Sequence, residues 1–414
     1  MKFIKPFLVL TTLIGISQAT FAQVAGDQKD ANLRAQAAKL AQKFVITDGH
    51  VDLPYRLKGD HFTKDRMAEI VSTKKGDFDF ERARKGGLDA PFMSIYIPSS
   101  YQQKPDYGKA LADSLIDLVE MITKALPDKF ALAKTPADVD ANTKAGKISF
   151  PMGMENGAPV GKDLKNVKYF YDRGIRYVTL THGKDNQFCD SSYDTIHTWK
   201  GLSPLGKELV KEMNRVGIMI DISHVDDSTF YQVMRLSKAP AIASHSSCRA
   251  FTPGFYRNMS DDMIKLLGKK DGVIQINFGS TFLDSVVRKK NDINGKQLRD
   301  LLKSKNLKAS DEAAKPVIEQ FRKDNPQAYA DVSTVADHID RAVKLAGVDH
   351  VGIGSDYDGV GDSLPTGLKD VSAYPNLIYV LLKRGYSESD IEKICYKNVW
   401  RVWNKVAEVA KASK

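Results

Sequence analysis

The sequence predicts an α/β fold, and within that class a (β/α)8 barrel of the TIM type with a helical insertion before its last strand. Eight short runs of apolar and β-branched residues alternate with longer stretches of helical periodicity. The connections are long enough for the crossovers that parallel strands require. Polar residues follow the runs directly, as expected where the carboxyl ends of barrel strands form one face. An open, doubly wound sheet is the alternative that the same alternation allows.

The eight predicted strands share a high content of Val, Ile, Phe and Ala. They are expected at residues 44–46, 91–97, 148–154, 177–180, 218–222, 239–243, 273–278 and 351–354. Helical spacing of apolar residues predicts helices at 27–43, 111–122, 164–173, 205–216, 259–267 and from 334 onward. Ser260 or Asp261 is expected to cap the helix at 259–267, and Thr334 with Asp337 predicts a capping box for the last one.

One connection is much longer than the others. Between Phe278 and Val351 the chain is charged and mostly helical in pattern, with a break at Asn325-Pro326. Its apolar content is low for an independent core, which favours an insertion over a separate domain. We therefore expect a single barrel domain over residues 23–414, with a helical insertion at about 280–333 that caps the functional face.

The first 22 residues predict a secretory signal peptide. Lys2 and Lys5 precede an apolar run at 7–16, and small residues at Ala19 and Ala22 offer cleavage sites. The run is shorter than the roughly 20 residues that a membrane-spanning helix needs, so a membrane anchor is the weaker alternative. We expect a protein that is exported to the periplasm or secreted, with no membrane span after cleavage.

Composition narrows the classes of partner. The formal net charge is +10, but the basic residues are scattered among acidic ones and form no stripe with interleaved aromatics, which argues against a nucleic-acid partner. The three cysteines, Cys189, Cys248 and Cys395, match no zinc-finger spacing. One disulfide with one leftover thiol is compatible with an oxidising compartment. The sequence leaves a homodimer open.

Histidines and carboxylates at the predicted strand ends form the candidate site. Imidazole and carboxylate together suit zinc and similar divalent metals, and their number exceeds what one catalytic ion needs. Residues i and i+2 of an extended chain point to the same side, so one ion can bind both members of a His-X-Asp pair. We assign His50 and Asp52 to one ion, Glu155 to a bridging position, and His224 and His245 to a second ion.

Six segments resemble the motifs of the membrane (renal) dipeptidase family, which are zinc metallopeptidases of the amidohydrolase group built on a (β/α)8 barrel. In the order of the family they are Asp48-Gly-His-Val-Asp52, Thr179-Leu-Thr-His182, Asp221-Ile-Ser-His224, Ser244-His-Ser-Ser247, Arg257-Asn258 and Gly352-Ile-Gly-Ser-Asp-Tyr-Asp-Gly359. The resemblance extends from about residue 44 to residue 401. It implies the same five metal ligands, two zinc ions and a bridging Glu155.

The resemblance also implies roles for three residues that hold no metal. His182 would stabilise the developing oxyanion, Arg257 would bind the free carboxylate of the substrate, and Asp356 would be the proton shuttle. The expected activity is hydrolysis of dipeptides by a water shared between two zinc ions, with tolerance of a D-residue at the C-terminal position left open. Two rivals are hydrolysis of a lactam, lactone or N-acyl amino acid in the same site, and non-catalytic binding of a metal or ligand.

Overall fold

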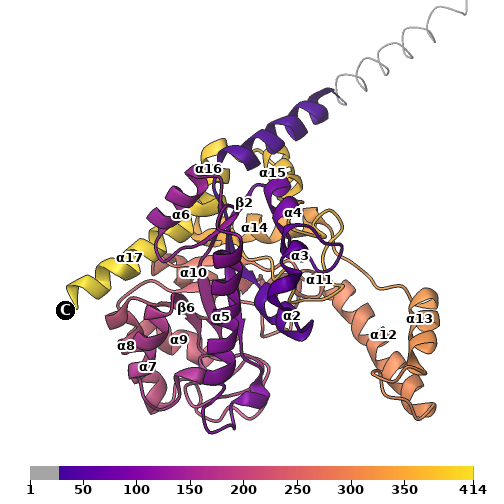
Figure 1. The fold of residues 1–414 in the computed structure, drawn as a ribbon, viewed down its shortest axis with the longest axis horizontal. Coiled ribbons are helices and arrows are strands. Elements are labelled where there is room, and N and C mark those ends of the chain that lie inside the picture. Colours follow the sequence, from indigo (N-terminus) through magenta and orange to yellow (C-terminus); the bar gives the residue numbers. More distant parts are fainter. Residues whose placement is uncertain (1–27, 414) are drawn as a thin grey trace, which may run out of the picture.

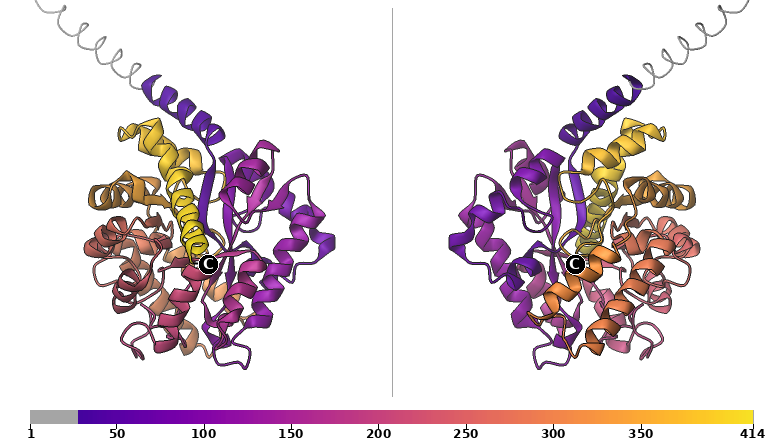
Figure 2. Two further views of the ribbon diagram at one scale, coloured as in Figure 1. Left: turned by 90° about the vertical axis from the view of Figure 1, so that its left-hand side faces the viewer. Right: turned by 90° about the vertical axis from the view of Figure 1, so that its right-hand side faces the viewer.

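Eight parallel strands form one sheet in the computed structural model, which describes residues 28–413. The predicted signal peptide lies outside these residues. The strands pair in their order along the chain, and Figure 2 shows them enclosed by helices. They are β1 (Ile46–Val51), β2 (Leu88–Tyr96), β5 (Met152–Glu155), β6 (Ile175–Thr179), β7 (Met219–Asp221), β8 (Ile242–Ser246), β9 (Val273–Ile276) and β10 (Val351–Ile353).

The first and last strands meet beyond the end of β10. An isolated parallel bridge joins Val51 to Tyr357. The N–H of Asp52 donates to the carbonyl of Tyr357 at 2.8 Å, and the N–H of Asp356 donates to the carbonyl of His50 at 3.1 Å. These bonds close the sheet at the functional end, so the predicted (β/α)8 barrel is confirmed.

Every predicted strand differs from the structure by at least one residue at a limit, and the three largest differences bear on the site. The run at 148–154 divides at Pro151, which has no N–H to donate to a ladder. Its first part, β4 (Ile148–Phe150), pairs with β3 (Phe130–Leu132) in a separate two-stranded sheet, and its second part is β5. The run at 44–46 is instead β1 at 46–51, and the run at 239–243 is instead β8 at 242–246. Both shifts place a predicted metal ligand, His50 or His245, inside a strand.

Helices cover the outside of the barrel (Figures 1 and 2), and every helix that the sequence predicted is present. Residues 28–43 form the leading helix. The others around the barrel are α2 (Leu53–Gly59), α3 (Ala68–Val71), α4 (Phe80–Gly86), α5 (Lys109–Ala125), α6 (Pro136–Lys144), α7 (Lys165–Asp172), α8 (Pro204–Val216), α9 (Asp227–Leu236), α10 (Asp261–Lys269), α14 (Val332–Ala346), α15 (Tyr374–Lys383), α16 (Glu388–Glu392) and α17 (Asn398–Ala412).

Capping residues explain where two of these helices begin. Ser260 is the N-cap of α10, because its side chain accepts from the N–H of Met263, so Ser260 rather than Asp261 fills the predicted position. The capping box predicted at Thr334 and Asp337 is wrong. Helix α14 begins earlier, with Asp331 as the N-cap and Thr334 at the third helical position.

The long connection before β10 forms a helical arm, which we define as residues 285–324. After the short α11 (Ser280–Leu283), the arm contains α12 (Ser285–Ser304) and α13 (Ala314–Asp324), and Figure 1 shows the two helices projecting together from the barrel. Helix α13 ends directly before the predicted break at Asn325-Pro326. Asn291 fastens the arm to the barrel side, because its amide pairs with both backbone groups of Ala328 at 2.9 Å.

Aromatic packing fills the barrel beneath the candidate site. The ring of Tyr177 contacts Phe92, with centroids 5.4 Å apart, and Phe92 contacts Trp403 of α17 at 5.3 Å. Full burial of such a side chain contributes roughly 1.5–3 kcal/mol, so this stack gives the site a rigid floor. Among residues 28–413 we find no helix with both the length and the apolar character that crossing a bilayer requires.

Candidate metal centre and active site

The predicted site residues meet at the carboxyl end of the barrel, where a cavity of about 790 Å³ opens between the strand ends. Five of them line this cavity. Glu155 ends β5, and the other four lie in loops that follow different strands: Asp52, His182, His224 and Asp356. His50 and His245 are fully buried beneath them. Residues separated by up to about 300 positions in the chain therefore share one centre, as a barrel requires.

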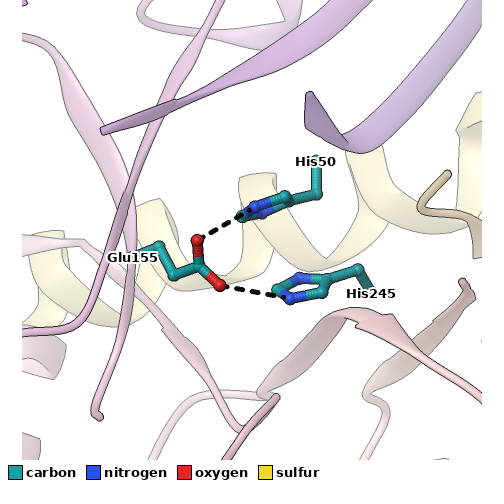
Figure 3. A group of neighbouring side chains, drawn as sticks. All are labelled: His50, Glu155 and His245. Carbon is teal, nitrogen blue, oxygen red and sulfur yellow. Dashed lines mark ion pairs between the residues drawn. The ribbon is translucent and has the colours of Figure 1, made fainter. Parts of the chain in front are cut away.

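Glu155 lies between two groups of imidazole rings. Its Oε2 is 3.3 Å from Nε2 of His50, and its Oε1 is 3.4 Å from Nε2 of His245 (Figure 3). The same Oε1 is 3.0 Å from Nε2 of His224. One carboxylate thus faces His50 with one oxygen and the pair His224 and His245 with the other, which is the arrangement expected of a bridging ligand.

The partners of His50 define which of its nitrogens carries a proton. The hydroxyl of Tyr177 donates to the carbonyl of Gly49 at 3.0 Å, so it can only accept from Nδ1–H of His50 at 2.9 Å. The lone pair of the neutral ring is then on Nε2, which faces Glu155 and lies 3.4 Å from Oδ2 of Asp52. A lone pair directed at two carboxylates is stable only with a cation between them.

A similar relay orients His245. The hydroxyl of Ser244 donates to Oδ2 of Asp221 at 2.7 Å. Its own oxygen, Oγ of Ser244, therefore accepts from Nδ1–H of His245, also at 2.7 Å. The lone pair of His245 is therefore on Nε2, toward Glu155. Metal-binding histidines are commonly held by this kind of outer partner, which fixes the tautomer and the ring plane.

His224 completes the group with a ring nitrogen that faces another ring nitrogen. Its Nε2 is 2.9 Å from Nε2 of His245, and its backbone has a φ of 68°, which turns the side chain back toward the centre. Its Nδ1 is buried and has no hydrogen-bond partner among residues 28–413, and the same holds for Oδ1 of Asp52. Unsatisfied buried donors and acceptors around a carboxylate fit a metal ion better than they fit a finished hydrogen-bond network.

The charges in the centre support this conclusion. Burial lowers the pKa of His224 and of His245 well below the usual value, so both rings are neutral and free to act as ligands. Burial favours the neutral form of Glu155, but the surrounding imidazoles outweigh it and hold its pKa well below the usual range. Burial also lowers the pKa of His50, yet Tyr177, Glu155 and Asp52 raise it well above 6.5. A positive charge at this position is favoured, whether a proton or a metal ion supplies it.

The donor set therefore fits divalent metal ions. Three groups of His, Asp and Glu place ligand atoms within 4.8 Å of one another, and they share members. The groups are His50 with Glu155 and His245, Glu155 with His182 and His224, and His50 with Asp52 and Asp356. Two ions could thus be held side by side with Glu155 between them.

His182 forms one wall of the cavity. Its side chain is 24% exposed, more than that of any of the buried histidines, and its Nε2 is 3.6 Å from Oε1 of Glu155. Its ring contacts Tyr96 edge to face and His224 at a tilt. Burial lowers the pKa of His182, so the ring is neutral and can donate a hydrogen bond from one nitrogen.

Asp356 lies opposite, on the loop that follows β10. Its φ of 65° directs the carboxylate into the cavity, and Oδ2 accepts from Nδ2 of Asn277 at 2.8 Å. Burial raises the pKa of Asp356 to about 7, with Asp52 and Glu155 adding to the effect and His50 opposing it. Gly359 is required next to it, because a Cβ there would lie 2.2 Å from Oδ2 of Asp52 and 2.3 Å from Oδ1 of Asp356.

Arg257, to which the family resemblance gives the role of binding the substrate carboxylate, contacts groups next to His245. Nη1 donates to Oγ of Ser246 at 2.8 Å and Nη2 donates to the carbonyl of His245 at 2.7 Å. The side chain is almost fully buried, and Nε alone has no partner among the described residues. Arg257 therefore stands behind the centre with one free donor, and it holds the segment that carries His245.

Sequence reasoning missed the aromatic walls of the cavity and one buried amide. Tyr55, Tyr96, Tyr193 and Phe282 line the cavity, and Tyr193 comes from the long loop between β6 and α8. Asn277 contacts Asp356, but the predicted strand at 273–278 included it as an apolar-run residue. A signal was available, because Asn277 is the first polar residue after β9 on the functional face.

The remaining histidines and the cysteines lie elsewhere. His197 is exposed and near Asp190 and Asp226, whose carboxylates already accept backbone N–H groups. His338 is fully buried, with its two ring nitrogens bonded to the backbone groups of Cys248 and Leu283. All three cysteines are buried and free, so the disulfide considered from the sequence is not formed.

Comparisons with known proteins identify relatives over nearly the whole chain. The family model for membrane dipeptidases matches residues 34–414. Dipeptidase 3 of Mus musculus is 31% identical over 388 residues, covering 93% of this chain and 69% of the mouse protein. The crystal structure of the probable dipeptidase PvdM from Pseudomonas aeruginosa has a TM-score of 0.76 at 27% identity, covering 92% of this chain and 100% of that one. A metallopeptidase from Rhodobacter sphaeroides, solved with a phosphinate mimic of the dipeptide L-Ala-D-Ala, has a TM-score of 0.71 at 25% identity, covering 88% and 99%.

Proposed function

This chain belongs to the membrane dipeptidase family of metallopeptidases, and we propose that it hydrolyses dipeptides with two zinc ions held around Glu155. The observation that carries the proposal is the position of this carboxylate, with His50 at one oxygen and His224 and His245 at the other. Asp52 would complete the first ion. Other divalent metals that accept imidazole and carboxylate ligands fit the same residues.

The metal ions and the side chains of the cavity would have different roles in the hydrolysis. Two such ions, when bound, would supply a water that ionises near neutral pH and a Lewis acid for the scissile carbonyl. The neutral ring of His182 is placed on the cavity wall to donate to the carbonyl oxygen as negative charge builds there. Asp356, whose pKa of about 7 suits proton transfer near neutrality, would accept a proton and pass it to the departing amine.

The proposed substrate is a short peptide with a free C-terminal carboxylate. The guanidinium of Arg257, whose Nε has no partner among the described residues, would bind this carboxylate, as the family resemblance implies. The Rhodobacter relative was solved with a mimic of L-Ala-D-Ala, which supports tolerance of a D-residue at the C-terminal position here. We also propose export to the periplasm or beyond, on the strength of the signal pattern at residues 1–22.

A substrate panel tests the activity. The purified chain with zinc is mixed with L–L and L–D dipeptides, a tripeptide, an N-acyl amino acid and a lactone, and release of amine or acid is followed. We expect turnover of dipeptides that is abolished by Glu155→Gln. Turnover of the lactone or the N-acyl amino acid alone would favour the rival hydrolase, and turnover of nothing would favour a metal carrier.

The proton-transfer assignment has its own test. Asp356→Asn keeps the shape and one hydrogen-bonding oxygen of the side chain but cannot carry a proton. We expect kcat to fall by roughly 10²–10⁴-fold, which is the usual contribution of a general acid or base, while metal content is unchanged. Metal analysis and steady-state kinetics on one dipeptide measure both quantities, and a fully active variant would remove Asp356 from the mechanism.

A further inference from the structure

Asn277 is the buried side chain that contacts Asp356. It directly follows β9, so it stands at the carboxyl end of the barrel with the residues of the centre. It is completely buried. A fully buried amide is costly unless its polar groups are paired, so its partners indicate its role.

The orientation of the Asn277 amide follows from its neighbours. Its Oδ1 accepts from the N–H of Gly279 at 2.6 Å, which leaves Nδ2 as the group that faces Asp356. Its backbone is fixed as well, because its N–H donates to the carbonyl of Ser246 at 3.2 Å and its carbonyl accepts from the hydroxyl of Ser247 at 3.3 Å. The donor aimed at Asp356 is therefore held on several sides.

Holding one oxygen of Asp356 determines where the other one points. Asn277 engages Oδ2, and Oδ1 is on the side of Asp52, since a methyl group on Gly359 would be within 2.3 Å of both carboxylates. The backbone of Asp356 is also tied, through its N–H, to the carbonyl of His50. Without the amide, rotation about the terminal torsion of the carboxylate would no longer be opposed by a hydrogen bond.

We propose that Asn277 is a positioning residue for the proton transfer, which holds Oδ2 of Asp356 so that Oδ1 is presented to the reacting atoms. The inference rests on the proposed function, because it assigns Asn277 an effect only through Asp356. The competing explanation is a structural one, in which the amide merely stabilises the turn at Gly279. The two explanations differ in whether the effect of Asn277 on the rate requires Asp356 to be present.

A double-mutant cycle separates these explanations. Asn277→Ala, Asp356→Ala and the double variant are compared with the unmodified chain in the presence of zinc. We expect Asn277→Ala alone to lower kcat by roughly 10–100-fold, with KM within about twofold and the metal content retained. In the Asp356→Ala background the same change should lower kcat by less than about twofold. An equal loss in both backgrounds, or no loss in the unmodified one, would overturn the proposal.

Two further variants control for the fold. Asn398→Ala removes another buried amide that supports β10, one whose Nδ2 donates to the carbonyls of Val348 and Val351 at 2.7 and 2.8 Å, away from the cavity. It should lower the melting temperature and keep kcat. If Asn277→Ala does not fold, Asn277→Asp takes its place, because it retains an acceptor for Gly279 but lacks the amide donor, and full activity of that variant would equally overturn the proposal.

The outcomes distinguish this inference from the proposed function. If the unmodified chain hydrolyses no dipeptide, the proposed function fails and this inference fails with it. If the unmodified chain is active and the cycle is additive, the proposed function stands and only the role of Asn277 is rejected.

Discussion

At the scale of single residues, the candidate ligands are oriented by side chains behind them, as Tyr177 contacts His50 and Ser244 contacts His245. His50, Glu155, His224 and His245 each follow or end an apolar run, and this pattern is visible without coordinates. Tyr177 looked like an ordinary strand residue. Its hydroxyl reaches His50 because the register of β1, β2, β5 and β6 places the two residues across the barrel from each other. That register depends on contacts between distant segments, so the sequence around Tyr177 does not reveal it.

Ser244 gives the first prediction, because it transmits the charge of Asp221 to His245. In Ser244→Ala the ring loses the acceptor for its Nδ1–H, so its tautomer and orientation are no longer fixed. We expect metal affinity to fall by roughly 10–100-fold, as is typical for loss of an outer partner of a ligand. A calorimetric titration with zinc measures the dissociation constant of the metal directly.

Ser237→Ala is the matched control for that titration. The hydroxyl of Ser237 donates to the carbonyl of Ala239, and neither residue lines the cavity. It should bind zinc as the unmodified chain does. Equal affinities for the Ser244→Ala variant and this control would show that the relay has no influence on the metal.

At the scale of elements, helix periodicity was a better guide than strand limits. Each predicted helix is present, because apolar spacing of three and four residues is a local signal. The strand limits shifted where a local rule was missed, as at Pro151, or where the strand starts later than the apolar run and continues into polar residues, as at 242–246. The arm at 285–324 was expected to be helical from its pattern, but its projection from the barrel is a property of packing that no local pattern carries.

His338 ties three elements together and gives the second prediction. From α14, its Nδ1 accepts from the N–H of Cys248 at 2.9 Å, and its Nε2–H donates to the carbonyl of Leu283 at 2.8 Å. Burial lowers the pKa of His338 from 6.5 to about 4. The unfolded chain binds this proton more readily than the folded one. The contribution of His338 to the free energy of unfolding is therefore fully present above pH 6.5 and is lost as the pH falls toward 4. The loss attributable to this ring approaches about 3 kcal/mol.

His338→Gln tests this linkage, since glutamine can accept from Cys248 and donate to Leu283 without titrating. Urea unfolding between pH 7 and 4.5 should show a smaller loss of stability for the variant than for the unmodified chain. Carboxylates contribute equally to both proteins, so the difference between the two curves isolates the histidine. Parallel curves would mean that the pKa of His338 is the same in the folded and the unfolded chain.

At the scale of the whole molecule, the centre joins segments from almost the entire barrel. Its residues come from β1, β5 and β8 and from the loops after β1, β6, β7 and β10. The alternation of strands and helices was enough to predict the barrel. The family resemblance, rather than any pattern of charge or spacing, was needed to predict what the barrel acts on.

Removal of metal gives the third prediction. An ion that binds only the folded state stabilises it by RT ln(1 + [L]/Kd), which is about 4 kcal/mol at a thousand times Kd. A chelator should therefore lower the melting temperature by several degrees, yet leave the chain folded, because the barrel core is independent of the metal ligands. Calorimetry with and without chelator measures the shift, and Glu155→Gln should shrink it. A chelator-insensitive melting temperature in both proteins would argue against metal binding.

The residues that could bind metal and the arm at the rim of the cavity belong to different parts of the chain. Every candidate metal ligand lies at or near the end of a strand or in the loop that directly follows it, whereas the arm occupies one connection, between β9 and α14, and meets the cavity through Asn291. We therefore expect that a replaced arm would change the rim of the cavity and leave the candidate metal ligands in place. Sequence changes in the arm would then alter which substrates reach the cavity while the metal-binding residues stay the same.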